Sequence, residues 1–340
     1  FGTQLLSGTT TLASLASATG RCWFTETPET SSTQVMIVSD GSDDYFINSA
    51  NVTVQIDEND DAQFPTSNLG PVCFFSNYLF HGKDGGVVNS NLNNFTAYTA
   101  GDSFPVGAKG DALEAIATQK DQLIAFGKGS IEFTFDNGNP TGSPLLAIDQ
   151  NRLSFGLASK NTLAWSGDAL MFVGENSAYG DGGRSVWLLQ AGAIKEVSND
   201  ALNRILKAEG TSISSASAWM ERVRGQLCYV LNLSSADRTF VFGMETGWTE
   251  WEDANGGNKF NGVSATSLNG TTYVQDATNG RVYTLSDTAF QDSGTGITVT
   301  LQTQKQGTTI PVRQTDRQAN LVADTQHVHY LSLPGSSSNF

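Results

Sequence analysis

One type of β-hairpin recurs along the chain at near-constant spacing, and this repetition constrains the fold more than any other feature. Its apolar inner strand can be placed six times, with successive separations of 43, 44, 47, 57 and 46 residues, at Met36, Leu79, Leu123, Leu170, Leu227 and Tyr273. Repeats of roughly 40–50 residues that consist mostly of strand are typical of β-propeller blades. A small sheet alone cannot bury both faces, whereas neighbouring blades bury each other's. The alternatives are a β-sandwich pair or a β-solenoid with accidental spacing.

The local sequence within these repeats favours strands joined by tight turns. An apolar run at 123–126 is followed by the turn Gly127-Lys128-Gly129 and then by the alternating segment 131–135. Glycine, asparagine and aspartate supply the backbone conformations that such turns need. We therefore predict an all-β fold, a β-propeller of about six blades.

Two segments depart from this pattern. Apolar residues spaced i, i+3, i+4 at Leu202, Ile205 and Leu206 predict a short helix that Ser198 caps. Near residue 290 the sequence pattern changes. Residues 296–301 are predicted to form a strand. The polar sequence after this strand, from Arg313 through Arg317 to His329, is predicted to be irregular. The expected domains are therefore 1–290, the propeller, and 291–340, a partial second β region or a linker.

The charge balance is strongly acidic. The chain of 340 residues has 19 Lys and Arg against 34 Asp and Glu, a formal net charge of −15. Residues 1–70 hold nine acids and one base, Arg21, which is −8 of that total. Because proteins bind nucleic acid mainly by neutralising phosphates with Lys and Arg, this composition disfavours wrapping of nucleic acid. No apolar run approaches the ~20 residues that a membrane-spanning helix needs, so we expect no membrane insertion.

Motifs for catalysis or for cofactors are weak. There is no phosphate-binding P-loop and no HExxH, and the glycines of 127–129 are better explained as turn residues. The acidic run 57–61 resembles half of a calcium loop, but Ala62 and Asn68 stand where glycine and glutamate are needed. His327 and His329 lack a nearby third ligand. We therefore predict no enzyme activity, no cofactor and no metal.

Two further groups have structural interpretations. The three cysteines Cys22, Cys73 and Cys228 are expected to be free thiols. The pair Trp248 and Trp251 could form a sugar-stacking platform, but a packing role is favoured. A spacing of three puts them on opposite faces of a strand, so one is predicted to pack and the other to lie near the surface.

A series of local signatures follows in order from about residue 20 to 305. They are Thr33–Gly41, Ile56–Glu58 with Phe64-Pro65, Asn77–Phe80, Phe126–Phe133, Leu170–Glu175, Gly183–Trp187, Thr246–Trp251 and Asn279–Tyr283. In this order they resemble the tail hub or nozzle proteins of short-tailed bacteriophages, also called packaged-DNA stabilisation proteins. That family continues beyond its propeller into a further β region, of which residues 291–340 would be only the start.

The resemblance implies a structural virion protein of the tail, assembled in the host cytoplasm. It implies a ring of six copies at the distal end of the portal–adaptor column, around the DNA exit channel. Its implied partners are other copies of itself, the tail adaptor proteins, and the needle, spikes or fibres. DNA would pass through the lumen without specific binding. The resemblance implies no catalytic residues.

Two sets of candidate residues follow from these observations. The acids expected to face the channel or an adaptor ring are Asp40, Asp43, Asp44, Asp57, Glu58, Asp60 and Asp61. The aromatic residues expected to pack the blades are Phe133, Trp165, Phe172, Trp187, Trp219 and Trp248. The alternative function is a carbohydrate-binding or glycan-hydrolysing propeller. A hydrolase of this kind would need two carboxylates about 5–10 Å apart, and the chain has no Asp-box repeat.

Overall fold

Most of the chain folds into strands. The structure is a computed structural model that describes residues 3–17, 21–28, 34–106, 111–139, 141–176, 183–253, 259–277, 281–286, 289, 291–292, 295–296, 298–302, 318–324 and 327–328. The chain divides into two compact units. The first unit is Phe1–Met220 with Leu233–Ala236, and the second is Glu221–Asn232 with Asp237–Phe340. The predicted division into 1–290 and 291–340 stays a prediction.

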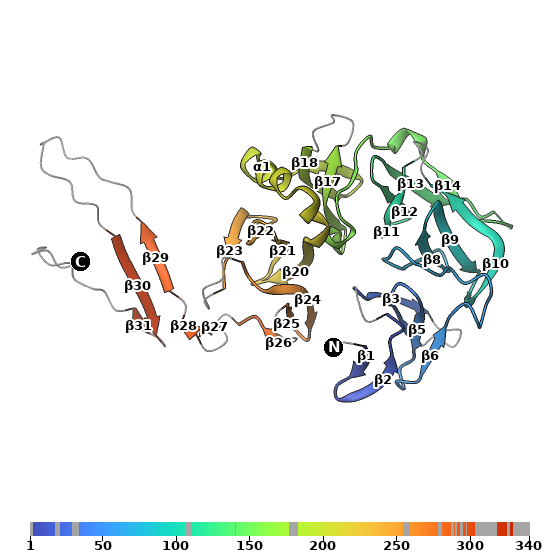
Figure 1. The fold of residues 1–340 in the computed structure, drawn as a ribbon, viewed down its shortest axis with the longest axis horizontal. Helices are drawn as coiled ribbons and strands as arrows, with labels where there is room; N and C mark the ends of the chain where they lie inside the picture. Colours follow the sequence, from blue (N-terminus) through green and yellow to red (C-terminus); the bar gives the residue numbers. More distant parts are fainter. Residues whose placement is uncertain are drawn as a thin grey trace, which may run out of the picture. The chain divides into compact units, whose positions relative to one another are not determined.

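Three four-stranded antiparallel sheets follow one another in the first unit (Figure 1). The first contains β3 (Trp23–Pro28), β4 (Gln34–Ser39), β5 (Asp44–Ile47) and β6 (Thr53–Ile56). The second contains β7 (Cys73–Phe75), β8 (Tyr78–Lys83), β9 (Gly86–Asn91) and β10 (Asn94–Pro105). The third contains β11 (Leu113–Gln119), β12 (Gln122–Gly127), β13 (Ile131–Asp136) and β14 (Leu145–Ala147). In each sheet, the strands are neighbours in chain order.

Three more sheets continue the series. The fourth contains β15 (Gly156–Leu157), β16 (Ala164–Ser166), β17 (Ala169–Asn176), β18 (Gly183–Gln190) and β19 (Ala193–Glu196). The fifth contains β20 (Ser217–Val223), β21 (Gln226–Leu233), β22 (Arg238–Gly243) and β23 (Gly247–Trp251). The sixth contains β24 (Gly262–Leu268), β25 (Thr271–Asp276) and β26 (Val282–Thr284).

The repeat found in the sequence corresponds to one strand of every sheet. The six predicted anchors lie in β4, β8, β12, β17, β21 and β25, and each of these is the second strand in the order of its sheet. The six sheets are the six blades of a β-propeller. The predicted all-β fold and its number of blades are therefore confirmed.

Short strands flank the six blades on both sides in sequence. Near the N-terminus, β1 (Gln4–Ser7) pairs with β2 (Thr10–Ser14). Beyond the blades, the structure contains β27 (Gln291–Asp292), β28 (Thr295–Gly296), β29 (Thr298–Gln302), β30 (Gln318–Asp324) and β31 (His327–Val328). The predicted strand at 296–301 overlaps β29. Irregular structure was expected after it, and this is wrong for β30, which pairs with β29 over five residues.

Successive blades of the first unit pack face to face, and this explains the wholly apolar runs in the sequence. On β12, Leu123 and Ala125 belong to a cluster shared with the second blade. On the same strand, Ile124 and Phe126 belong to a cluster shared with the fourth blade. Side chains alternate between the faces of a strand, so all four are buried although they are consecutive. A strand buried on both faces reads as a continuous apolar run.

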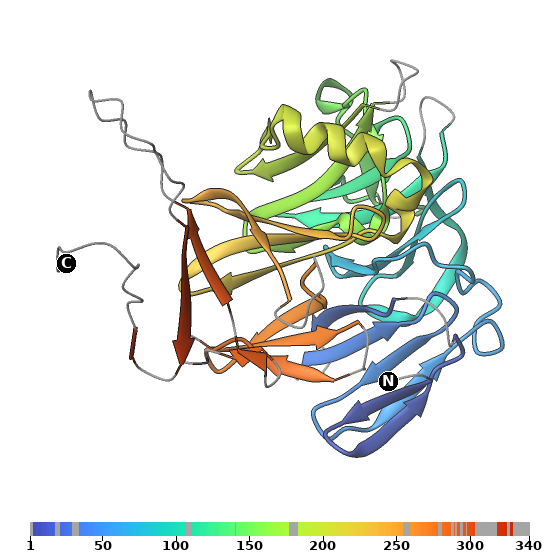
Figure 2. The same ribbon diagram turned by 60° about the vertical axis from the view of Figure 1, so that its left-hand side comes forward.

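The α-helix α1 (Asp200–Ala208) lies beside β18 (Figures 1 and 2). Its predicted apolar face is correct, since Leu202 and Leu206 are buried. Its predicted cap is wrong: the side chain of Asn199 accepts the hydrogen bond from the Leu202 backbone N–H at 2.9 Å. Ser198 instead accepts from the Val186 backbone N–H at 2.8 Å, because the chain at Ser198 still follows the sheet. Among the described residues, no helix is long and apolar enough to cross a membrane.

Candidate functional site

The predicted acidic residues gather in the first blade, around β5 and in the segment that follows β6. The structure separates them into two groups. Asp40 and Asp44 are buried, with 7% and 0% of their surface exposed. The other five lie partly or fully at the surface of the chain: Asp43, Asp57, Glu58, Asp60 and Asp61. Buried carboxylates do not line a channel or contact an adaptor ring, so Asp40 and Asp44 are removed from the candidates, and the assignment of the other five stays a prediction.

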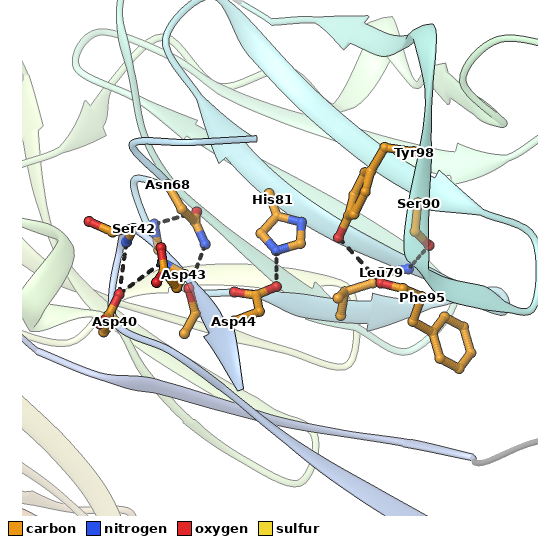
Figure 3. Close-up of polar contacts among 12 residues, drawn as sticks. Asp40, Ser42, Asp43, Asp44, Asn68, Leu79, His81, Ser90, Phe95 and Tyr98 are labelled. Carbon is orange, nitrogen blue, oxygen red and sulfur yellow. Dashed lines mark hydrogen bonds and ion pairs between the residues drawn. The ribbon is translucent and has the colours of Figure 1, made fainter. Parts of the chain in front are cut away.

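Asp40 holds the turn between β4 and β5 (Figure 3). Its Oδ1 accepts hydrogen bonds from the backbone N–H groups of Ser42 and Asp43, both at 2.9 Å. Its Oδ2 accepts from the Ser17 backbone N–H at 2.9 Å. A short acidic side chain that accepts from backbone two and three residues ahead is a turn-forming arrangement. Asp40 is buried because it accepts hydrogen bonds both from its own turn and from the backbone at Ser17.

Asp44 forms a buried hydrogen bond with His81, which lies on β8 of the second blade (Figure 3). His81 Nε2 and Asp44 Oδ2 are 2.7 Å apart, and the two side chains are 0% and 1% exposed. The rings of Phe64 and Tyr98 meet the imidazole edge-on, with centroids 5.9 and 5.7 Å away. Since a carboxylate accepts only, His81 carries a proton on Nε2 when Asp44 is ionised. The pair joins two adjacent blades inside an apolar and aromatic environment.

In the part of the chain that the structure describes, neither side chain of this pair makes a second hydrogen bond. Among the described residues, Asp44 Oδ1 and His81 Nδ1 are both buried and without a partner. Sequence reasoning considered His327 and His329 but not His81, whose only sequence signal is its position within an apolar strand pattern. The side chain of His327 is not described, and His329 lies outside the described residues.

The surface acids after β6 stabilise their own turn. Asp57 Oδ1 accepts from the Asn59 backbone N–H at 2.6 Å, and this bond lowers the pKa of Asp57 below its ordinary value. Asp60 Oδ2 accepts from the Asp57 backbone N–H at 3.2 Å. Asp61 Oδ2 reaches the Tyr98 backbone N–H at 2.8 Å. Glu58 and Asp60 are exposed. Four acids within five residues therefore present negative charge on an ordered turn.

Asp43 lies at the edge of the same surface. Its Oδ2 accepts from Gln55 Nε2 at 2.6 Å. Partial burial raises the pKa of Asp43 above its ordinary value, and the negative charges of neighbouring acids raise it by a smaller amount. Among the described residues, no three His, Cys, Asp or Glu side chains gather closely enough to hold a metal ion.

The predicted blade aromatics have different positions. Phe133, Phe172 and Trp219 are buried, at 7%, 0% and 3% exposure. Trp187 is half-buried and stacks on Phe155, with ring centroids 4.4 Å apart. Trp165 is 38% exposed, so its assignment to blade packing is corrected. It lies on β16, a short strand that pairs only with one end of β17.

Both tryptophans of β23 pack against an aromatic neighbour, whereas only one of them was expected to pack. Trp248 contacts Phe242, with ring centroids 5.1 Å apart. Trp251 meets Phe260 edge-on at 5.5 Å. Both tryptophans are half-buried. Opposite faces of one strand can both be covered when each face has its own aromatic neighbour, and the sequence spacing alone does not reveal such neighbours.

Two basic side chains tie distant segments of the first unit together. Arg21 donates to the carbonyl oxygens of Asn161 at 3.0 Å and Ala218 at 3.2 Å. Its guanidinium also lies 5.3 Å from the centre of the Trp23 ring. Lys160 donates to the Leu69 carbonyl at 2.8 Å. These cations therefore form internal cross-links between distant segments, which sequence reasoning missed.

The glycine turn between β12 and β13 has a specific partner. Asp111 accepts from the Gly129 backbone N–H at 2.7 Å and from the Ser130 hydroxyl at 3.0 Å. A Cβ on Gly127 would lie 2.4 Å from Asp111 Oδ2. Only glycine therefore leaves room for this carboxylate. The turn interpretation accounts for the glycines without any phosphate.

Similarity to solved structures is distant. PorZ, a surface component of the type-IX secretion system of Porphyromonas gingivalis, is 10% identical over 88% of this chain and 31% of its own length, with a TM-score of 0.42. BamB from Moraxella catarrhalis is 11% identical over 76% and 80% of the two chains, with a TM-score of 0.39. Virginiamycin B lyase from Staphylococcus aureus is 9% identical over 74% and 76%, with a TM-score of 0.44. No argument about function rests on these likenesses.

A comparison with protein families is more informative. No curated protein matches the chain. A family model described as the β-propeller of bacteriophage P22 Gp10, a phage stabilisation protein, matches residues 1–290. That range contains all six blades and both groups of acidic residues. The chain therefore belongs to the phage stabilisation family of P22 Gp10, whose members are structural tail proteins with a β-propeller fold.

Proposed function

We propose that this chain is one subunit of a ring-shaped tail nozzle or hub that forms the DNA exit channel. In this role it retains packaged DNA and anchors the needle, spikes or fibres. Family membership over residues 1–290 carries the proposal. The ring consists of six copies below the adaptor proteins, and it is assembled in the host cytoplasm before it becomes part of the virion. The role is mechanical and needs no catalysis.

The charge of the chain supports a conduit for DNA. A net charge of −15 repels phosphates, and a channel that gripped DNA through Lys and Arg would oppose its exit. We assign Asp43, Asp57, Glu58, Asp60 and Asp61 to the channel wall or to the contact with an adaptor ring. An adaptor surface in contact with them would be basic.

The hydrogen bonds of Arg21 and Lys160 limit where a DNA channel can lie. Arg21 joins segments 140 and 197 residues away, and Lys160 joins one 91 residues away. Passage of DNA between these segments would break the three hydrogen bonds. We therefore place the channel between copies of the chain, each of which remains intact during DNA exit.

Mass measurement of the purified chain in solution and electron microscopy test the ring. A closed ring of six copies is the expected result. A chain that remains monomeric with its adaptor proteins present would overturn the nozzle assignment.

Charge reversal tests the acidic surface separately. In phage particles that carry Glu58→Lys with Asp60→Lys, we expect either weaker attachment of the ring to the adaptor or slower DNA exit. Glu245→Lys, at an exposed acid of the fifth blade, serves as the control. Normal attachment and normal DNA exit in the double variant would contradict the assignment of these acids.

A further inference from the structure

A pocket of about 790 Å³ lies in the first unit, between α1 and the ends of β17 and β18. This volume is within the range of about 300–1,000 Å³ typical of small-molecule sites. The tail assembly proposed above does not use this pocket, so the inference below does not depend on it.

One wall of the pocket is aromatic and fixed in place. Trp187 and Phe155 both line it, and their rings stack 4.4 Å apart with an interplanar angle of 22°. A Cβ on Gly174 would lie 2.6 Å from Trp187 Cδ1, so glycine is required for the indole to lie against the strand. Since both rings are only half-buried, this wall combines a rigid apolar surface with access from solvent.

The opposite wall is the polar face of α1. Asp200, Asn203, Arg204 and Lys207 line the pocket, and their spacing of i, i+3, i+4 and i+7 places them on one face of the helix. Asn203 Nδ2 donates to Glu196 Oε1 at 2.9 Å, which fixes the direction of the amide. This wall offers more donors than acceptors, since Arg204 and Lys207 only donate and Asp200 only accepts.

Arg184 lies between these two walls and is held rigidly. Its guanidinium donates to the carbonyl oxygens of Leu206 at 3.2 Å and Gly210 at 2.8 Å, and it pairs with Glu175. The Arg184 side chain is 10% exposed. Ordering such side chains before binding reduces the entropy cost of binding.

Two polar atoms of the pocket residues still lack a hydrogen bond. Among the described residues, the donor Arg184 Nε and the acceptor Asn203 Oδ1 are both buried and without a partner. Both atoms lie beneath the surface of the pocket, and other hydrogen bonds hold their side chains, so a ligand in the cavity does not reach them. The polar side chains that α1 exposes along the pocket are those of Asp200, Arg204 and Lys207.

The charges of the pocket indicate the kind of ligand. Arg204 and Lys207 are balanced by Glu196 and Asp200, and Arg184 is balanced by Glu175. A multiply charged anion would gain little in this balanced field. We propose that the pocket binds a neutral saccharide, with one sugar ring against Trp187 and its hydroxyl groups bonded to Asp200, Arg204 and Lys207 on α1.

Binding can be measured on the full chain with the methyl glycosides of glucose, galactose and N-acetylglucosamine as probes. Saturation-transfer NMR reports contact of each sugar, and a titration gives its affinity. We expect at least one neutral sugar to bind with a Kd of about 1 mM. We expect at least tenfold weaker binding in Arg204→Ala and in Lys207→Ala. Lys195→Ala, on neighbouring β19 and outside the pocket, should bind as the unaltered chain does.

Thermal unfolding establishes that each variant is folded before binding is compared. No saturation transfer from any of the three neutral sugars to the folded chain would overturn the proposal. Equal affinity in the unaltered chain and in both pocket variants would overturn it as well. Glucuronic acid is the charged comparison, and tighter binding of this acid than of methyl glucoside would contradict a neutral ligand.

Discussion

The buried pair of Asp44 and His81 gives the sharpest test of how the first two blades are held together. We expect His81→Phe to destabilise the chain, because a ring remains at this position but the hydrogen bond to Asp44 is lost. Asp44 Oδ1 already has no partner among the described residues. The substitution therefore leaves a carboxylate that is 1% exposed without the contact that compensates its loss of water.

The magnitude follows from this geometry. Removing the partner of a buried charge typically costs about 3–5 kcal/mol, because the remaining charge is uncompensated. For a chain of this size, each kcal/mol lowers Tm by roughly 2 °C, so Tm should fall by roughly 6–10 °C. Replacing both partners, as Asp44→Leu with His81→Phe, removes the buried charge as well. The double variant should then be more stable than His81→Phe alone.

Denaturant unfolding and calorimetry measure these differences. Glu58→Gln, at an exposed acid of the same blade, is the matched control and should change stability by less than about 0.5 kcal/mol. The reasoning is refuted if His81→Phe unfolds within about 1 kcal/mol of the unaltered chain. It is also refuted if the double variant is no more stable than His81→Phe.

Three further predictions concern other parts of the molecule. Phe172→Ala should cost about 3–5 kcal/mol in the free energy of unfolding, because Phe172 is wholly buried between two blades, and calorimetry checks this. Asp111→Ala should cost about 1–3 kcal/mol and should speed amide exchange at Gly129, measured by hydrogen–deuterium exchange. Burial raises the pKa of the Cys73 thiol from 9.0 to about 12, so the folded state favours its neutral form. This stabilisation is fully present below about pH 9 and is lost as the pH rises toward 12, so the free energy of unfolding should decrease more steeply in this range than in Cys73→Ala.

The sequence was informative about the blades because their signal is local and repeated. Each of Leu79, Leu123 and Leu170 lies on the second strand of its sheet, and the pattern of apolar runs and turns around them needs no knowledge of distant residues. The helix was also predictable from its spacing, whereas its cap was not. Ser198 and Asn199 are both good caps, and the choice between them depends on the Val186 backbone N–H, which Ser198 satisfies.

The acidic residues show why the site was harder to predict than the fold. In the sequence, Asp44 and Asp60 belong to the same excess of negative charge. In the structure, Asp44 is enclosed because His81, 37 residues away, lies opposite to it, and Asp60 is exposed on a turn. Burial of a carboxylate requires a partner, and that partner becomes known only when two blades are placed side by side. The excess of negative charge in the first blade therefore combines a buried carboxylate that holds two blades together with acids exposed on a surface turn.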